Sequence, residues 1–465
     1  MTQTDETPTS PETPGDLLPE TRRALDHRLA TAQATGRAPS VLAAVVRGGR
    51  TVWSAARGEL PEGARPEDVQ YRIGSLTKTF TALLVLRLRE QGLLALDDRL
   101  GDHLPAPHGA RATVAQLLTH TAGLAAEARG PWWERTPGAL RPELTDVFGE
   151  APQLHPHGLR FHYSNPGYAL LGALVERLRG EPWSTVLRRE VLEPLGLERT
   201  TALPAPPHAA GWAVHPHADA RQPEPAVDTG RMAPAGQLWS TLGDLAAFAG
   251  FLLRGDDRVL GAKSLAAMRE PAAPPEGPGW ESCYGLGLQL LRREGRVLAG
   301  HSGSMPGFVA CLWTSPEEDL AAVALANATS GPPVASLAAG LLELVARREP
   351  PLPPVWRPGP GADPELTALT GTWYWGTVPA GLRLLPGRAL LLEPAGGGVR
   401  GSRFLPAADG TWTGIEGYYA GETLRVVRGA SGAAEALDVG TFVFTRRPYD
   451  PGAPLPGGAD PEGWR

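Results

Sequence analysis

The run of prolines and glycines at Glu349–Pro364 (EPPLPPVWRPGPGADP) divides this chain into two parts that cannot share one continuous element of secondary structure. Proline removes backbone donors and keeps the chain extended, so neither a helix nor a strand is expected to run through the segment. It therefore predicts a linker between separately folded domains. The length of 465 residues agrees, because a single hydrophobic core usually stops growing at roughly 250–300 residues.

The two sides of this linker carry different hydrophobic patterns. Before it, strand-like runs occur at both ends, at Val41–Val46 and Thr51–Ala56 and again at Leu320–Ala326, with helical segments between them. We therefore expect one sheet whose strands come from both ends of this part. After the linker, Leu366–Arg447 shows only short segments bounded by turns, which is typical of a small antiparallel barrel or sandwich.

Periodicity and turn signals place the individual elements. Helices are predicted at Leu17–Gly36, Thr77–Glu90, Val114–Leu118, Tyr168–Leu178, Trp183–Leu192, Thr241–Leu253 and Val334–Ala346. Further strands are predicted at Tyr284–Leu291, Val297–Leu298 and Phe308–Thr314. The helix at Thr77–Glu90 is apolar on more than one face, so we expect it in the middle of its domain.

The chain is thus expected to have five parts. Residues 1–15 are acidic and proline-rich, which indicates a disordered leader. Residues 16–348 form the larger mixed domain and residues 349–364 form the linker. Residues 365–447 form the β domain, and residues 448–465 form an extended or disordered tail.

Charge, cysteine content and the N-terminal segment exclude several classes of protein. The formal net charge of -6 lacks the basic character of a nucleic-acid or anionic-membrane binder. With only Cys283 and Cys311, a disulfide scaffold is excluded; one bridge or two thiols remain, and thiols are favoured. The first thirty residues contain no apolar segment of a signal peptide, and no apolar run is long enough to span a membrane, so a cytoplasmic location is expected.

Three short motifs carry candidate chemistry. Ser75 and Lys78 form an S-x-x-K pattern at the start of the apolar helix, where one helical face holds both side chains and desolvation makes a lysine a usable base. Tyr163 and Asn165 form Y-S-N directly before a helix. A tyrosine ionised with the help of a nearby lysine can relay a proton, and an asparagine can hold a substrate amide. His301 opens H-S-G at the expected start of a strand, and its glycine would let substrate approach the backbone.

Each motif alone is weak, but their order S-x-x-K, Y-x-N, H-x-G resembles the penicillin-recognising serine hydrolase superfamily. This group contains class C β-lactamases, D-Ala-D-Ala carboxypeptidases, D-aminopeptidases and related esterases. The resemblance covers about residues 20–347 and extends to other segments, among them Tyr71–Gly74, Leu96–Leu100, Leu117–Leu124, Gly236–Phe248, Tyr284–Gly287 and Gly300–Phe308. It implies an α+β fold: an antiparallel sheet flanked by helices, with a helical insertion and the active site at their junction.

The resemblance also implies a covalent mechanism without a metal or an organic cofactor. Ser75 would attack an acyl carbon, while Lys78 and Tyr163 share the role of base in a division that remains open. Asn165 would orient the substrate and the lysine. His301 would replace the lysine of a K-T-G motif and help to polarise the site. The backbone N–H groups of Ser75 and Ser304 would form the oxyanion hole.

Departures from the common pattern narrow the expected function. The H-x-G motif makes an efficient β-lactamase less favoured, and the absence of an export signal argues against a cell-wall enzyme. The segment Leu369–Gly376 (LTGTWYWG) resembles the start of the lipocalin-like domain of penicillin-binding-protein-type thioesterases. Those enzymes release nonribosomal peptidyl thioesters, join them head to tail, and prefer a D-configured C-terminal residue. This resemblance implies a peptidyl thioester as substrate and a peptide synthetase carrier protein as partner.

Other interpretations remain open at this point. The same site could serve a cytoplasmic esterase, a D-aminopeptidase or D-amino-acid amidase, or a β-lactamase-like hydrolase, each with water as acceptor. A member that only binds or regulates is the alternative from another class. Besides Gly303, three side chains are candidates for substrate binding: Trp239, Arg446 and Arg447. For these three, a role in packing or at the surface is an equally good interpretation.

Overall fold

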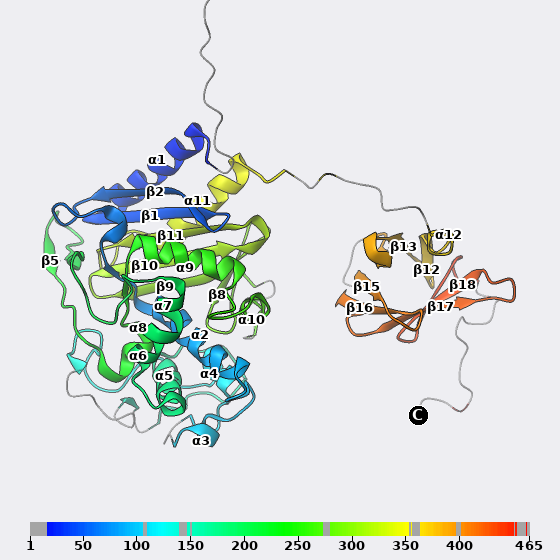
Figure 1. Cartoon of the computed structure of the whole chain (residues 1–465), viewed down its shortest axis with the longest axis horizontal. Coiled ribbons are helices and arrows are strands. Elements are labelled where there is room, and N and C mark those ends of the chain that lie inside the picture. Colours follow the sequence, from blue (N-terminus) through cyan, green and yellow to red (C-terminus); the bar gives the residue numbers. More distant parts are fainter. Residues whose placement is uncertain are drawn as a thin grey trace, which may run out of the picture. The chain divides into compact units, whose positions relative to one another are not determined.

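A computed structural model describes residues 16–105, 109–138, 147–148, 151–272, 280–352, 355, 363–396, 401–450, 452 and 462. The expected leader, most of the expected linker and most of the expected tail lie outside these residues. The chain divides into two compact units, Met1–Leu352 and Pro353–Arg465, and each is described by itself (Figure 1).

The first unit is built on a seven-stranded antiparallel sheet with the order β2–β1–β11–β10–β9–β8–β7. The strands are β1 Ser40–Arg47, β2 Arg50–Gly58, β7 Ser282–Tyr284, β8 Gln289–Arg293, β9 Arg296–Met305, β10 Phe308–Ser315 and β11 Leu320–Ala326. Val41 of β1 lies opposite Ala326 of β11. The expectation that both ends of this part contribute to one sheet is therefore confirmed.

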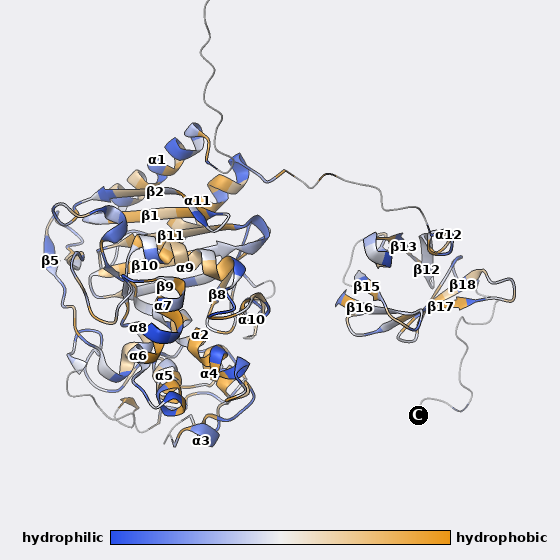
Figure 2. Ribbon diagram, in the orientation of Figure 1, coloured by the Kyte–Doolittle hydropathy of each residue, from blue (hydrophilic) through white to orange (hydrophobic). Residues whose placement is uncertain are grey.

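Helices cover both faces of this sheet (Figure 1). Helices α1 Pro19–Gly36 and α11 Val334–Arg348 pack on one face, and α9 Leu242–Arg254 packs on the other. Strand β1 shows why: its alternate residues belong to two different hydrophobic clusters, and both clusters are closed to solvent. A strand covered on both faces has a continuous apolar sequence rather than an alternating one, as the orange strands of Figure 2 show.

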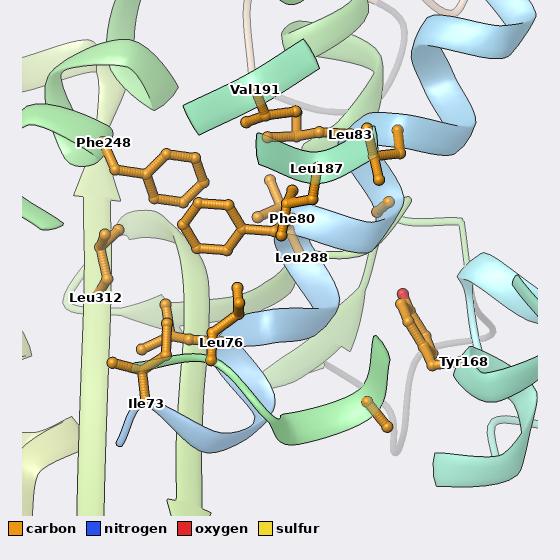
Figure 3. Packing of buried hydrophobic residues seen from close by; sticks show 14 of the residues in the cluster. Ile73, Leu76, Phe80, Leu83, Tyr168, Leu187, Val191, Phe248, Leu288 and Leu312 are labelled. Carbon is orange, nitrogen blue, oxygen red and sulfur yellow. The ribbon is translucent and has the colours of Figure 1, made fainter. Parts of the chain in front are cut away.

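Helix α2, Thr77–Glu90, runs through the larger of these clusters, as expected from its apolar surface. Phe80 on α2 stacks on Phe248 of α9 with ring centroids 4.1 Å apart, and Leu76 and Leu83 pack nearby (Figure 3). Stacked rings of this kind add about 0.5–1.5 kcal/mol to the stabilisation from burial alone. The start of α2, where Ser75 lies, is therefore held firmly by the core.

Short elements fill the region between β2 and β7. Its helices are η1 Pro66–Asp68, η2 Gly74–Leu76, α3 Leu100–His103, α4 Val114–Leu118, α5 Asn165–Arg179, α6 Trp183–Leu187, η5 Arg188–Leu192, α7 Glu193–Leu195, η6 Gly230–Met232, α8 Ala233–Gly236 and α10 Ala262–Met268, and η7 Pro316–Glu318 follows β10. Two small sheets join β3 Tyr71–Arg72 to β6 Trp239–Ser240 and β4 Trp212–Val214 to β5 Arg221–Pro223.

Two details differ from the sequence prediction. Tyr284–Leu291 is not one strand, because Gly287 with a φ of +81° turns the chain between β7 and β8. His301 does not stand at the start of a strand, since it lies inside β9 opposite Leu312 of β10. Both differences arise where glycines break an otherwise apolar run. A glycine there can mark either a bend in the chain or a close approach of another backbone to a continuing strand.

The second unit is a closed antiparallel barrel of eight strands. Its elements are α12 Pro364–Thr367, β12 Gly371–Trp375, β13 Val378–Leu384, η8 Pro386–Arg388, β14 Leu390–Pro394, β15 Ser402–Pro406, β16 Trp412–Gly417, β17 Thr423–Arg428, β18 Ala434–Val439 and β19 Phe442–Thr445. The sequence pattern predicts seven of these strands, at Thr372–Trp375, Leu382–Leu385, Ala389–Glu393, Gly401–Leu405, Gly410–Thr413, Thr423–Val427 and Gly440–Thr445. It misses β18, whose sequence AEALDV is poor in β-branched residues. The expected combination of a helix-flanked antiparallel sheet and a small β-barrel is confirmed.

Two further expectations can be compared with the described residues. Among the described residues, no helix is both long enough and apolar enough to cross a bilayer. Cys283 and Cys311 are both thiols rather than the two halves of a disulfide, which agrees with the favoured interpretation.

Candidate active site

Ser75 lies in the one-turn helix η2, directly before α2 and half-buried. The turn requires glycine at the preceding position, because Gly74 has a φ of +52°. A Cβ atom on Gly74 would also come within 2.6 Å of the backbone nitrogen of Ser304 in β9. The turn is thus pressed against β9, and Ser75 is presented at the N-terminal end of a buried helix.

Lys78 lies one turn further along and is 0% exposed. Its Nζ atom donates hydrogen bonds to Ser75 Oγ at 3.0 Å, Asn165 Oδ1 at 2.7 Å and the carbonyl oxygen of Ala235 at 2.7 Å. Burial lowers the pKa of Lys78 to about 7, although the charge of Glu127 opposes this shift. A lysine in this state is available as a base near neutral pH, as the S-x-x-K motif predicted.

Tyr163 and Asn165 reach the same point from the start of α5. Ser164 caps this helix, since its Oγ accepts a hydrogen bond from the N–H of Gly167. Tyr163 is placed with its ring centroid 4.8 Å from Nζ of Lys78. Burial raises the pKa of Tyr163 above its ordinary value, and a hydrogen bond with Ser75 only partly opposes this. The expected ionisation of the phenol is therefore wrong for this structure, and the phenol is a proton donor.

His301 is also brought to the site, but not as a cation. Its Nδ1 atom lies against the carbonyl oxygen of Ser302, which can only accept, so Nδ1 carries the proton. Its Nε2 atom then accepts from the hydroxyl of Tyr284 at 2.8 Å. Burial lowers the pKa of His301 to about 3. His301 therefore stands at the site as a neutral imidazole, and its expected role in polarising the site stays a prediction.

Gly303 and Ser304 follow on the same strand. A Cβ atom on Gly303 would lie 2.0 Å from the carbonyl oxygen of Ile73 and 2.8 Å from the backbone nitrogen of Ser75. The space that a side chain at Gly303 would need is thus filled by the turn that carries Ser75, so the packing of this turn requires glycine, and the expected approach of substrate here stays a prediction. The same close fit brings the backbones of Ser75 and Ser304 together, which is the arrangement an oxyanion hole requires.

Of the three other predicted substrate-binding residues, Trp239 does not line this site, and Arg446 and Arg447 belong to the second unit. Trp239 is 1% exposed and packs edge-on against Phe308 with ring centroids 5.1 Å apart, so it belongs to the core. Arg446 lies in the other unit, where its guanidinium stacks 3.8 Å from the ring centroid of Trp373 and donates to backbone carbonyls. Arg447 is exposed on the same unit. For Trp239 and Arg446 the packing interpretation is the correct one.

The structure adds two residues to which sequence reasoning assigned no role. His120 has a φ of +58°, and its Nδ1 atom accepts from the backbone N–H of Ser164 at 3.0 Å. Its ring lies 4.2 Å from that of Tyr163. Glu127 accepts from Asn165 Nδ2 at 2.9 Å. His120 lies in Leu117–Leu124, a segment that resembles the superfamily, so the sequence could have indicated it. Glu127 lies in an irregular loop, where no sequence pattern indicates a role.

These residues together can perform acyl transfer. They supply a half-buried hydroxyl, a lysine whose pKa is about 7, a protonated phenol and two closely packed backbone segments, those of Ser75 and Ser304. Within the described ranges, no three His, Cys, Asp or Glu side chains gather as a candidate metal site.

Comparison with known families agrees with this geometry. Residues 25–347 match the sequence model of the Beta-lactamase family, and residues 362–446 match a domain of unknown function, DUF7586. Penicillin-binding protein 4 of Amycolatopsis lactamdurans is 31% identical over 284 residues, which are 56% of this chain and 72% of the relative.

Solved structures show the same likeness. The D-stereospecific amidohydrolase of a Streptomyces species is 26% identical with a TM-score of 0.56, over 67% of this chain and 95% of that one. SurE is 26% identical with a TM-score of 0.57 and covers 92% of this chain and 99% of its own; it has also been solved with D-Leu.

Proposed function

Because this chain belongs to the Beta-lactamase family and is a serine hydrolase of the penicillin-binding-protein type, we propose that it forms an acyl-enzyme on Ser75 and transfers a peptidyl group from a thioester to an amine. In the preferred reaction that amine is the N-terminus of the same peptide. The product is then a head-to-tail cyclic peptide.

The observation that carries the catalytic part is the set of contacts around Lys78. Its Nζ atom is within 3.0 Å of Ser75 Oγ, and the pKa of Lys78 is about 7. Neutral Lys78 takes the hydroxyl proton as Ser75 attacks the acyl carbon. The C–S bond breaks, and the thiolate receives a proton from Lys78 or from Tyr163. The amine nitrogen then attacks the ester, forms the amide, and returns a proton to the oxygen of Ser75.

The choice of acyl donor rests on similarity. SurE, solved with D-Leu, covers 92% of this chain, so its likeness extends over the barrel as well as the catalytic unit. The LTGTWYWG segment resembles penicillin-binding-protein-type thioesterases. We therefore propose a D-configured residue at the acyl carbon, a carrier protein as the natural leaving group, and a cytoplasmic place of action.

A peptidyl pantetheine thioester with a C-terminal D residue tests this function. We expect release of pantetheine together with a cyclic product, detected by mass spectrometry, and much slower release from the diastereomer with an L residue. Ser75→Ala is the control, and a fluorophosphonate probe should label Ser75 in the native enzyme. If a simple ester is hydrolysed while the thioester gives neither cyclic nor linear peptide, the cyclase function is wrong.

Hydrolysis is the second candidate, because the D-stereospecific amidohydrolase aligns over the catalytic unit at 26% identity. In that case water attacks the acyl-enzyme. Recovery of only the linear acid from the D thioester, together with rapid turnover of D-amino-acid amides or esters, would favour this candidate. Failure of Ser75 to react with the fluorophosphonate would instead revive the interpretation that this member only binds or regulates.

A further inference from the structure

Glu127 stands at the mouth of the catalytic site and is linked to it by hydrogen bonds. One carboxylate oxygen accepts from Asn165 Nδ2 at 2.9 Å, and Asn165 in turn accepts from Lys78 at 2.7 Å. The other oxygen accepts from the indole N–H of Trp133 at 2.9 Å. A carboxylate has about four acceptor positions. Two are used, so this fixed and exposed group can accept further hydrogen bonds.

Trp133 extends this surface towards the nucleophile. A Cβ atom on Gly236 would lie 3.5 Å from Cη2 of Trp133 and 3.8 Å from the carbonyl carbon of Gly74, the residue before Ser75. The far edge of the half-buried indole is therefore close to the turn that carries the nucleophile. A carboxylate beside an aromatic ring is a combination that attracts an ammonium group, through a charge-assisted hydrogen bond and the ring quadrupole.

Two buried cationic side chains of this region, Lys78 and Arg72, are engaged elsewhere. The amino group of Lys78 is held by Ser75, Asn165 and the carbonyl oxygen of Ala235. Arg72 is 1% exposed and donates to the carbonyl oxygen of Val227, and its charge acts on Glu134 rather than on Glu127.

His301 is neutral and is hydrogen-bonded to Tyr284. Among the described residues, no ion pair involves Glu127. The carboxylate of Glu127 therefore keeps acceptor positions that no ion pair of the described residues uses, while its charge also acts on Lys78.

We propose that Glu127, together with the ring of Trp133, binds a free ammonium group of the substrate close to the acyl carbon. The substrates are accordingly acyl compounds or acceptors with an unblocked primary amine, and compounds with a carboxylate at this position are disfavoured by repulsion. This inference rests on the proposed acyl-enzyme function and specifies the substrate class of that site.

Two parts of a substrate could supply the ammonium. It is either the α-ammonium of the acyl donor or the amine of the acceptor. In the second case the bound ammonium releases one proton to water before its nitrogen attacks the ester of Ser75. The second proton goes to the departing oxygen of Ser75 as the amide forms, so the balance is complete without another reactant.

Paired substrates distinguish these sources. In the first arm, water is the acceptor, and the measured ratio is kcat/KM for D-phenylalanine methyl ester divided by kcat/KM for its N-acetyl derivative. In the second, the N-acetyl ester acylates the enzyme, and the ratio of amide to acid is measured with glycinamide as acceptor. Each ratio is measured for the native enzyme, for Glu127→Gln and for Glu20→Gln. Glu20 is an exposed residue of α1, and α1 packs on the face of the sheet opposite to the one that α9 covers.

We expect Glu127→Gln to lower one of the two ratios by about tenfold, because the variant loses one charge-assisted hydrogen bond to the substrate. Glu20→Gln should leave both unchanged. Because each ratio compares two reactions of the same variant, a general loss through Asn165 cancels. Unchanged ratios in both arms, with the N-acetyl ester still hydrolysed, would overturn the inference alone. If no ester is hydrolysed and Ser75 resists labelling, the inference and the proposed function fail together.

Discussion

Nζ of Lys78 donates a hydrogen bond to Oγ of Ser75 at 3.0 Å, although the side chain of Lys78 is 0% exposed. The base of this site is therefore part of the hydrophobic core, and its proton affinity is set by the packing around α2. A surface lysine at the same spacing would remain an ammonium ion at neutral pH.

The first prediction concerns activity and pH. Since Lys78 acts as a base only when deprotonated, and its pKa is about 7, kcat/KM for a neutral ester should be low in acid and rise to a plateau above about pH 7. Lys78→Met should abolish this limb along with the activity. Because burial raises the pKa of Tyr163 above its ordinary value, a rate that only begins to rise well above pH 10 would assign the role of base to Tyr163 instead.

The second prediction concerns stability and pH. The pKa of Lys78 falls from 10.5 in its ordinary state to about 7 here, so the unfolded chain binds more protons than the folded chain between these values. The free energy of unfolding contributed by this residue should therefore increase with pH over that window. Urea titrations at pH 7 and pH 9 should show this increase in the native enzyme and a smaller one in Lys78→Met.

The third prediction tests the fit between β9 and the turn of Ser75. In Gly303→Ala the new Cβ would meet the carbonyl oxygen of Ile73 at 2.0 Å, so the strand must move away. Loss of one oxyanion donor typically lowers kcat by about 10²–10³-fold, and a loss of that order is expected. Gly396→Ala is the matched control because nothing lies within 4 Å of its Cβ. Equal kcat values for both variants would show that Ser304 is not a donor.

The fourth prediction concerns Asn165, which joins Lys78 to Glu127. In Asn165→Asp a carboxylate replaces the amide oxygen 2.7 Å from Nζ of Lys78. A neighbouring negative charge favours the ammonium form, so the rising limb of the pH profile should move to higher pH by about one unit or more. Asn165→Ala removes the contact without adding charge, and an upward shift in that variant would contradict the electrostatic explanation.

The fifth prediction separates barrel stability from catalysis. Arg446 stacks on Trp373 and donates to the carbonyl oxygen of Thr370, and bonds to a charged group are worth about 1.5–3 kcal/mol each. Arg446→Ala should lower the calorimetric transition of the barrel, whereas exposed Arg447→Ala should not. Hydrolysis of a small neutral ester should be the same in both. A large loss of that activity in Arg446→Ala alone would show that Arg446 contributes to substrate binding.

Sequence reasoning worked where one local pattern determines one local structure. The apolar run Val41–Val46 and the helix Thr77–Glu90 have their predicted bounds to within a residue, because burial on several faces leaves an uninterrupted apolar sequence. The S-x-x-K spacing likewise placed Lys78 beside Ser75. In each case neighbours along the chain supply most of the information.

It failed where distant segments meet. The protonation of Tyr163 and His301 depends on burial by strands and loops that are far away in the sequence, so their charge could not be derived from the motifs. Glu127 belongs to the site only through a hydrogen bond to Asn165. Arg446 is a candidate for substrate binding by its sequence, but its guanidinium stacks on Trp373, a contact that no local pattern indicates.

The pairing of β1 with β11 determines when this enzyme can fold. β1, buried on both faces, leaves the ribosome well before its neighbour β11, which is made about 270 residues later, counting from Arg47 to Leu320. Such non-local pairing slows folding. Until then a strand of continuous apolar sequence has one edge unpaired, and exposed strands of this kind aggregate readily. Successful production in a heterologous host should therefore depend on translation rate and chaperone supply more than on the stability of the finished fold.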